Sequence, residues 1–327
     1  MPAPVIVDTQ PSYLVVYKPP QMHTVPLHRT VPLNSPVPLH RTDRDETLLD
    51  WCARLFPEVL SSRGRNPWEG GMLHRLDYET GGLVLLARNQ TALDTLLKDQ
   101  SEGRFVKEYE AAAVKAETRL PGFPAAPSTR SLLRFAHFNL QKSPSGDFLP
   151  CKLRSETKFL QEPTYRGFFA ASSARRPCTV AHPQVQQAPG EALPGSLPFS
   201  AVESAFRAYG PGGKAVRPVV TAVAGAHRRA VLDKGKPYRT EIIHWETQGE
   251  YTRFRLRIYR GFRHQIRCHL AWLGYPLLND TLYGGRICPH SPGLALRAQG
   301  ISFPDPETGE LREYALPVTA FLISEAR

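Results

Sequence analysis

The sequence predicts a globular fold that mixes β-strands with short α-helices. Apolar residues make up 41% of the chain, and with the 24 glycines added this is close to the usual share in globular proteins. Apolar runs of strand length alternate with stretches that have the helical period. No apolar run approaches the roughly 18 residues that a bilayer-spanning helix needs. A transmembrane protein and a fully disordered chain are therefore excluded.

Turn and cap signals divide the first 114 residues into alternating elements. Residues 9–12 (TQPS) form a turn cluster between two short apolar runs. The continuous apolar run at 83–86 has the length of a buried strand. Asn89 can cap a following helix by accepting a backbone N–H, and Gly103 can end that helix. The predicted elements are strands at 5–7, 13–17, 83–86 and 105–114, and helices at 47–60 and after residue 89.

Regular structure is predicted again after residue 236. Residues 240–246 and 251–260 are predicted as strands, and the second alternates basic and apolar residues as a half-exposed strand does. Residues 264–273 have the helical period, and Gly274 can end the helix. The side of this helix that we expect to be buried carries Ile266, Leu270 and Leu273.

Residues 115–235 are predicted to contain a Pro-rich basic insertion. Residues 177–218 contain seven prolines, and residues 163–235 hold nine Lys or Arg against three Asp or Glu. Such a composition is typical of loops. Two interpretations remain open for this segment, a solvated basic loop and an arm that faces RNA.

The chain is strongly basic. Lys and Arg outnumber Asp and Glu by 41 to 30, which gives a formal net charge of +11. This balance predicts a polyanionic partner, either nucleic acid or an anionic membrane surface. The membrane ranks lower, because the sequence has no amphipathic basic helix or lipidation signal. Residues 251–270 carry six arginines and no acid, and because such charges repel one another without an anion, they predict phosphate contact.

The cysteines and histidines give no sign of a metal or a disulfide framework. The five cysteines are widely spread and form no CxxC pair, which favours a reducing, cytoplasmic compartment. The N-terminal residues lack the pattern of a signal peptide. His264 and His269 are five residues apart and do not share a helix face, so we expect helix-surface or RNA-contacting groups and no metal site.

Asp77 lies in the block HRLDYETGGLVLLAR at 74–88, in a loop that leads into the predicted buried strand. Loops held by a rigid scaffold often carry catalytic groups. Taken alone, an RxD sequence is more simply explained by an Asp that pairs with Arg75 or caps the turn. Two further blocks follow along the chain, RFVKEYEA at 104–111 and GFRHQIRCHLAWLGYPLLNDTLYGG at 261–285.

In this order, the three blocks resemble HRLDxxTSGLLLLAK, RxxxKxYxA and GRTHQIRxHLxxLGxPIxGDxxYGG of the RluA/RluC/RluD-type pseudouridine synthases. With weaker blocks the resemblance covers residues 5–114 and 235–320. The sequence departs from the family pattern at Gly82, where the family usually has Ser, at Phe262, where it often has a polar or small residue, and at Asn279, where it has Gly.

The resemblance implies an α+β fold, with a mixed, largely antiparallel central sheet, flanking helices and a central catalytic cleft. It implies that residues 1–327 form a single catalytic domain, which contains the insertion within 115–235 and lacks the N-terminal S4-like module of many relatives. The HRLD loop and the HQIR helix are expected to line the cleft.

The function implied by the resemblance is that of an RNA pseudouridine synthase, which isomerises specific uridines in rRNA or tRNA without a cofactor. We expect a cytoplasmic monomer. Because the base is kept and no water is activated, one carboxylate suffices, whereas a glycoside hydrolase usually needs two. Asp77 would act as a nucleophile at C1′ or C6, or as a base at the sugar. The alternative is a catalytically silent RNA-binding protein on the same scaffold.

The resemblance also assigns roles to other residues. Arg267 would pair with Asp77 and lower its pKa, and Tyr109 would stack on the flipped uracil. Arg75 would fill the space left by the flipped nucleotide. Without the resemblance, Tyr109 would be a core residue and Arg75 a solvated loop residue. Further residues expected to bind RNA are His74, Thr80, Arg263, His264 and Gln265.

Overall fold

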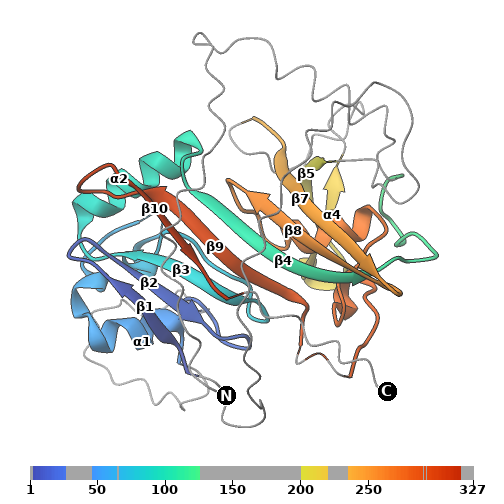
Figure 1. Cartoon of the computed structure of the whole chain (residues 1–327), viewed down its shortest axis with the longest axis horizontal. Helices are drawn as coiled ribbons and strands as arrows, with labels where there is room; N and C mark the ends of the chain where they lie inside the picture. The colour runs from blue at the N-terminus through green and yellow to red at the C-terminus, as the bar shows by residue number, and fades with distance from the viewer. Residues whose placement is uncertain are drawn as a thin grey trace, which may run out of the picture.

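The computed structural model describes residues 3–26, 46–64, 66–125, 200–219, 235–289, 291 and 293–317. A sheet of ten strands crosses the molecule in the order β1-β2-β3-β9-β4-β8-β7-β5-β6, and β10 pairs with β9 (Figure 1). Among the described strands, β3 and β9 form the one parallel pair. This arrangement confirms the α+β class with a mixed, largely antiparallel sheet.

The observed elements agree with most of the predicted ones. The helix predicted at 47–60 ends at Leu55, and a 3₁₀ helix follows from Pro57, whose ring cannot continue an α-helix. The α-helices are α1 (Leu48–Leu55), α2 (Gln90–Glu102) and α4 (Gln265–Trp272). The strands are β1 (Val5–Thr9), β2 (Tyr13–Lys18), β3 (Gly81–Ala87), β4 (Val106–Val114), β5 (Ala201–Tyr209), β6 (Ala215–Val219), β7 (Tyr238–Gln248), β8 (Tyr251–Ile258), β9 (Leu296–Pro304) and β10 (Leu311–Ala315).

Strand β3 is buried on both faces, which explains its continuous apolar run. Leu83 and Leu85 pack in the cluster that includes the apolar side of α2, whereas Val84 and Leu86 pack in the cluster that includes α1. Helix α2 begins as predicted, with the Asn89 side chain accepting the N–H of Ala92, and it ends at Gly103 in the left-handed conformation. Strand β3 directly follows the Asp77 loop, and its packing on both faces gives that loop a rigid support.

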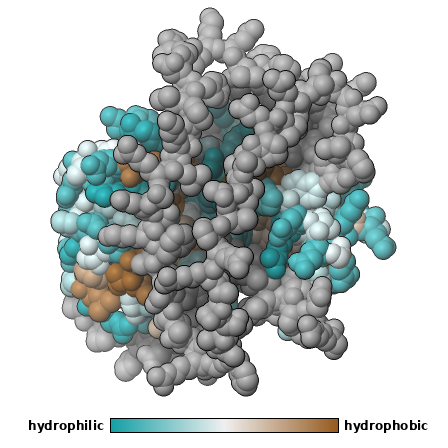
Figure 2. All heavy atoms as spheres, in the orientation of Figure 1, coloured by the Kyte–Doolittle hydropathy of each residue, from teal (hydrophilic) through white to brown (hydrophobic). Residues whose placement is uncertain are grey.

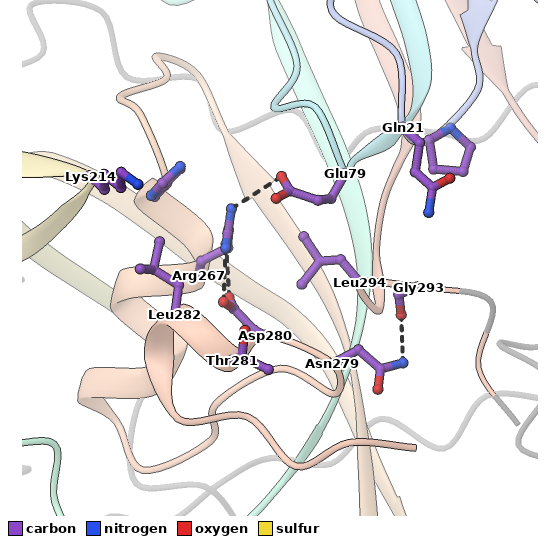
Figure 3. A pocket seen from close by; sticks show the side chains of 12 residues that line it. Gln21, Glu79, Lys214, Arg267, Asn279, Asp280, Thr281, Leu282, Gly293 and Leu294 are labelled. Atoms are coloured by element: carbon purple, nitrogen blue, oxygen red, sulfur yellow. Dashed lines mark hydrogen bonds and ion pairs between the residues drawn. The ribbon is translucent and has the colours of Figure 1, made fainter. Parts of the chain in front are cut away.

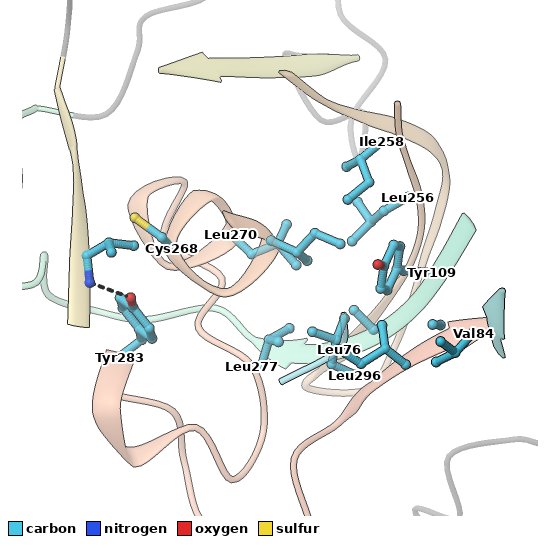
Figure 4. Close-up of a cluster of buried hydrophobic side chains, with 14 of the residues drawn as sticks. Leu76, Val84, Tyr109, Leu256, Ile258, Cys268, Leu270, Leu277, Tyr283 and Leu296 are labelled. Atoms are coloured by element: carbon cyan, nitrogen blue, oxygen red, sulfur yellow. Dashed lines mark hydrogen bonds between the residues drawn. The ribbon is translucent and has the colours of Figure 1, made fainter. Parts of the chain in front are cut away.

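Helix α4 is buried on all sides, whereas the sequence predicted one buried side. All eight of its side chains are buried, because it contacts β6 and β7 as well as packing in the main core (Figure 4). His269, expected at the helix surface, is fully buried, and its ring bonds the hydroxyls of Ser204 and Thr240. The expectation of an RNA contact at His269 was wrong.

Part of the predicted insertion belongs to the sheet. Strands β5 and β6 form an antiparallel hairpin inside 115–235, and β5 also pairs with β7. Phe206 of β5 stacks on Phe262, with ring centroids 5.0 Å apart, so the unusual Phe262 secures this hairpin. The expectation of loops was therefore wrong for these two strands, and contact of this segment with RNA stays a prediction. Residues 126–199 and 220–234 of the insertion lie outside the described part of the chain.

The arginines of β8 have carboxylate neighbours on the adjacent strands. Arg257 pairs with Glu108 of β4 at 2.6 Å, and Arg255 lies 3.5 Å from the same carboxylate. Arg253 lies 3.8 Å from Glu246 of β7. The prediction that these arginines need a phosphate to balance their charge missed these partners, because Glu108 is distant in the sequence.

The surface drawn in Figure 2 is mostly hydrophilic where it belongs to described residues. Hydrophobic side chains gather at the lower left of this view, over the region of β1 and α1. Leu55, at the end of α1, is 54% exposed. None of the described helices is both long enough and apolar enough to cross a membrane.

Gly82 lets β3 lie directly against β9, and we expect its replacement to destabilise the fold. Its φ is +139°, and a Cβ there would lie 2.3 Å from the carbonyl oxygen of Ala298, so the family's serine would not fit this backbone. We expect Gly82→Ala to lower the free energy of unfolding by about 1–3 kcal/mol, measured by chemical denaturation. Gly293→Ala is the matched control, because φ is +148° there but a Cβ would meet open space. Equal losses in both variants would contradict this role.

Candidate active site

Asp77 lies in the loop before β3, and this loop is tied to the N-terminal segment. The Thr24 hydroxyl donates to the carbonyl of Leu76 at 2.8 Å and accepts the Leu76 N–H at 3.1 Å. The N–H of Thr80 donates to the carbonyl of Asp77 at 3.1 Å, which closes a turn. These contacts on both sides therefore hold the backbone that carries the Asp77 side chain, which is 26% exposed.

Lys18, the last residue of β2, also supports this loop. Its buried ammonium group donates to the carbonyls of Pro19 and Met22, and at 3.4 Å to the carbonyl of Tyr78. Burial lowers the pKa of Lys18 to about 7, although the carboxylates of Asp77 and Glu79 oppose this shift. The lysine thus holds the residue that follows Asp77.

Arg267 of α4 connects three carboxylates. Its Nε and Nη2 each donate to Asp280 at 2.8 Å, and this pair is buried. Its Nη1 lies 3.6 Å from Glu79 (Figure 3) and 3.8 Å from Asp77. The expected neighbour of Asp77 is in place, but Asp280 is the closer partner. Burial disfavours the charged form of Arg267. The hydrogen bonds and the negative charge of Asp280 favour that form more strongly, so the pKa of the guanidinium is raised.

The pKa of Asp77 is raised, whereas a lowered value was expected. Burial is the largest cause, and Arg267 acts against it by favouring the carboxylate. Glu79 and Asp280 raise the pKa further through their negative charges. The predicted pKa of Asp77 took account of Arg267 alone. It left out the burial of Asp77 and the charges of the two neighbouring carboxylates.

Tyr109 of β4 belongs both to the core and to the site. Its ring is 7% exposed and packs in the main hydrophobic cluster, near Leu256 and Val84 (Figure 4). Burial raises the pKa of its hydroxyl, and the charge of Asp77 raises it further. The tyrosine therefore stays protonated and presents a neutral aromatic ring close to Asp77.

Three residues predicted to bind RNA direct polar groups toward the protein interior. One ring nitrogen of His74 contacts the carbonyl of Leu83 at 3.2 Å, and the other is buried. The Gln265 amide donates to the Arg239 carbonyl and its oxygen accepts the Phe262 N–H. Thr80 is buried, with a hydroxyl that has no hydrogen-bond partner among the described residues. His74 and Gln265 thus have internal partners, and their contacts with RNA stay predictions.

The other three residues predicted to bind RNA lie nearer the surface. Arg75 is exposed and lies 3.1 Å from Glu69. Arg263 is exposed and donates to the carbonyl of Gly213 at 2.6 Å. His264 precedes α4 with φ of 55°, and burial together with Arg267 and Arg263 lowers its pKa to about 3.

A pocket of about 490 Å³ opens beside Arg267 (Figure 3). Glu79 points into it from the Asp77 loop, and Lys214 reaches it from the turn between β5 and β6. Its walls therefore join the Asp77 loop, α4 and the hairpin of the insertion. The lining residues are Pro20, Gln21, Glu79, Lys214, His264, Arg267, Asn279, Asp280, Thr281, Leu282, Gly293 and Leu294.

Sequence reasoning missed several groups of this site. Asp280 stood in a quoted block, NDTLYGG, so its place beside Arg267 could have been suspected from that motif. Lys18 stood in VVYKPP at 15–20, one of the weaker blocks of the family resemblance. Asn279, where the family has Gly, has φ of 62°, and its side chain bonds the carbonyl of Gly293 at 2.8 Å. Lys214 carried no signal, because its segment was predicted as a loop.

The amino-acid sequence of the chain matches a known family. The family described as RNA pseudouridylate synthase matches residues 12–272, which is well over half of the chain. The chain belongs to this family. The resemblance seen in the three sequence blocks is thereby confirmed.

Similar proteins include two bacterial relatives. "Ribosomal large subunit pseudouridine synthase D" of Vibrio vulnificus is 36% identical over 120 residues, which are 33% of this chain and 37% of that protein. An "Uncharacterized RNA pseudouridine synthase" of Chloroflexus aurantiacus is 35% identical over 96 residues, 29% of this chain and 30% of that protein. The matched stretches thus span about a third of these relatives.

Among solved structures, "Human RNA Pseudouridylate Synthase Domain Containing 1" aligns over 96% of this chain and 83% of its own, with a TM-score of 0.48 and 16% identity.

Proposed function

We propose that this protein is an RNA pseudouridine synthase that uses Asp77 as its nucleophile or base. The observation that carries this proposal is the half-buried carboxylate of Asp77, which lies 3.8 Å from the buried guanidinium of Arg267 beside a pocket. Membership of the family supports it. The intact Asp77, Tyr109 and Arg267 favour an enzyme over a silent RNA-binding protein.

The contacts of these residues fit the chemistry. Pseudouridine formation breaks the bond between N1 and C1′, turns the uracil and joins C5 to C1′. Arg267 favours the reactive carboxylate form of Asp77 against the effect of burial. Tyr109 would offer its ring to the flipped uracil, and Arg75 would occupy the space that the nucleotide leaves.

The substrate that we propose is rRNA or tRNA, and the names of the relatives favour ribosomal RNA of the large subunit. We propose a cytoplasmic protein that acts as a monomer, in which residues 1–327 form a single catalytic domain with the β5–β6 hairpin as part of its sheet. Further candidates for RNA contacts are His74, Thr80, Arg263, His264 and Gln265, together with Lys214 in the pocket.

The experiment that tests this function uses unmodified transcripts of the host's rRNAs and tRNAs that carry [5-³H]uridine. A pseudouridine synthase releases tritium from C5 to water, and digestion of the RNA then yields pseudouridine. Purified protein should give both products in equal amounts. RNA that is bound but releases no tritium from any transcript would favour the silent RNA-binding protein instead.

Replacing Lys214 with alanine is expected to weaken RNA binding. Lys214 is exposed at the pocket rim and makes no ion pair with a described residue. If it neutralises one phosphate of a single strand, the slope of log affinity against log salt should become shallower by about 0.7. Lys98→Ala, on the exposed side of α2, is the control and should leave the slope unchanged. Equal slopes for wild type and Lys214→Ala would contradict this contact.

A further inference from the structure

Pseudouridine formation needs a base in its last step, and the roles given above to Asp77 and Arg267 leave that task unassigned. Once C5 has bonded to C1′, C5 still carries its own hydrogen and the ring has a double bond between N1 and C6. The product carries no hydrogen at C5 and one at N1. A group at the site must therefore accept the C5 proton.

Most titratable groups of the described site are unsuited to this task. Asp280 is buried and uses both oxygens to hold Arg267. Tyr109 keeps its own proton, because burial raises the pKa of its hydroxyl. His264 has a pKa lowered to about 3 by burial and the neighbouring arginines, so its charged form is unfavourable. Lys18 is buried and donates to three carbonyls.

Glu79 differs from these groups in its position. It follows Asp77 by two residues, lines the pocket and is 48% exposed, so a bound base can reach it. Its Oε2 lies 3.6 Å from Nη1 of Arg267 (Figure 3). The same nitrogen lies 3.8 Å from Asp77. The turn before β3 therefore presents two carboxylates to one guanidinium. Arg267 orients the second as well as the first.

We propose that Glu79 is the general base that takes the C5 proton in the last step of pseudouridine formation. This assignment rests on the proposed function. The Glu79 carboxylate forms a bond to the C5 hydrogen, and the C5–H electron pair becomes the C5–C6 double bond. The π pair of the N1–C6 bond moves to N1, which takes a proton from water. Glu79 then releases its proton to solvent.

The test compares uridine with 5-fluorouridine in the rRNA and tRNA transcripts, under single-turnover conditions. With fluorine at C5 there is no proton to remove, so the C5–C1′ bond can form without a base and water adds at C6. We expect Glu79→Gln to slow tritium release from [5-³H]uridine by about 100-fold or more. The same variant should form the fluorinated C5-linked product, measured by mass spectrometry, at a rate close to that of wild type.

Two further variants complete this test. Glu79→Asp keeps a carboxylate and should restore part of the tritium release. Glu307→Gln, on an exposed turn before β10, should behave as wild type on both substrates.

Three results would overturn the proposal. An equal loss on both substrates would place Glu79 in an earlier step, and unchanged tritium release in Glu79→Gln would remove it from the reaction. A wild-type protein that converts neither substrate would overturn the proposed function together with this assignment.

Discussion

Replacing Asp77 with asparagine is expected to abolish pseudouridine formation while the fold is kept. Asparagine has nearly the same volume but lacks the charge that reacts, and we expect a loss of roughly 10⁴-fold or more in single-turnover rate. Because burial raises the pKa of Asp77 and so disfavours its charge, losing that charge should not weaken the fold. Rate and denaturation midpoint are measured on the same preparation, with the unmodified transcripts as substrate.

The control for Asp77→Asn is Asp94→Asn, the same change on the exposed side of α2. This control should keep the wild-type rate. Activity of Asp77→Asn within a few-fold of wild type would show that another group carries the reaction. A protein that binds no RNA after this substitution would assign Asp77 to binding rather than to the chemical step.

Replacing Arg267 with alanine should damage both the fold and the reaction. The substitution leaves Asp280 buried without a cation, which typically costs about 3–5 kcal/mol. It also removes the charge that favours the ionised form of Asp77. Arg267→Lys should lose less stability and less activity than Arg267→Ala, because lysine keeps the charge. It should still lose some of each, because lysine cannot form the two parallel N–H bonds to Asp280. Denaturation and single-turnover assays measure the two effects.

A double substitution separates these two roles of Arg267. In Arg267→Met with Asp280→Leu the buried charges are both absent, and such a replacement is often neutral for stability. We expect the free energy of unfolding to recover while turnover stays low. Recovered turnover in this double variant, or a stable and active Arg267→Ala protein, would contradict the role of Arg267 at Asp77.

Elements that carry their own local signals were predictable from the sequence. Helix α2 has a cap at Asn89, a stop at Gly103 and a leucine side between them, and each of these acts within the segment itself. Strand β3 was predictable because burial on both faces leaves a continuous apolar run.

Elements that depend on distant partners were not predictable in the same way. The β5–β6 hairpin lies in a proline-rich segment, and its attachment to the sheet depends on β7 and on Phe262. The burial of α4 on all sides depends on its contacts with this hairpin. The sequence predicted only one buried side, because the hairpin itself was not predicted.

The same distinction holds for the site. Asp77, Tyr109 and Arg267 were placed together by the family resemblance, because periodicity cannot show that a loop, a strand and a helix meet. The direction of Glu79 depends on the turn that Thr80 closes, and the pairing of Arg267 with Asp280 depends on the chain after α4. Neither follows from residue spacing alone.

The most direct test of the central claim is a map of pseudouridines in total RNA from three strains of the host. One strain carries the wild-type protein, one lacks it, and one carries Asp77→Asn at the same level. We expect one or more sites in rRNA or tRNA to be modified in the first strain and unmodified in the other two. Identical maps in all three strains, or sites restored by Asp77→Asn, would contradict an Asp77-dependent pseudouridine synthase.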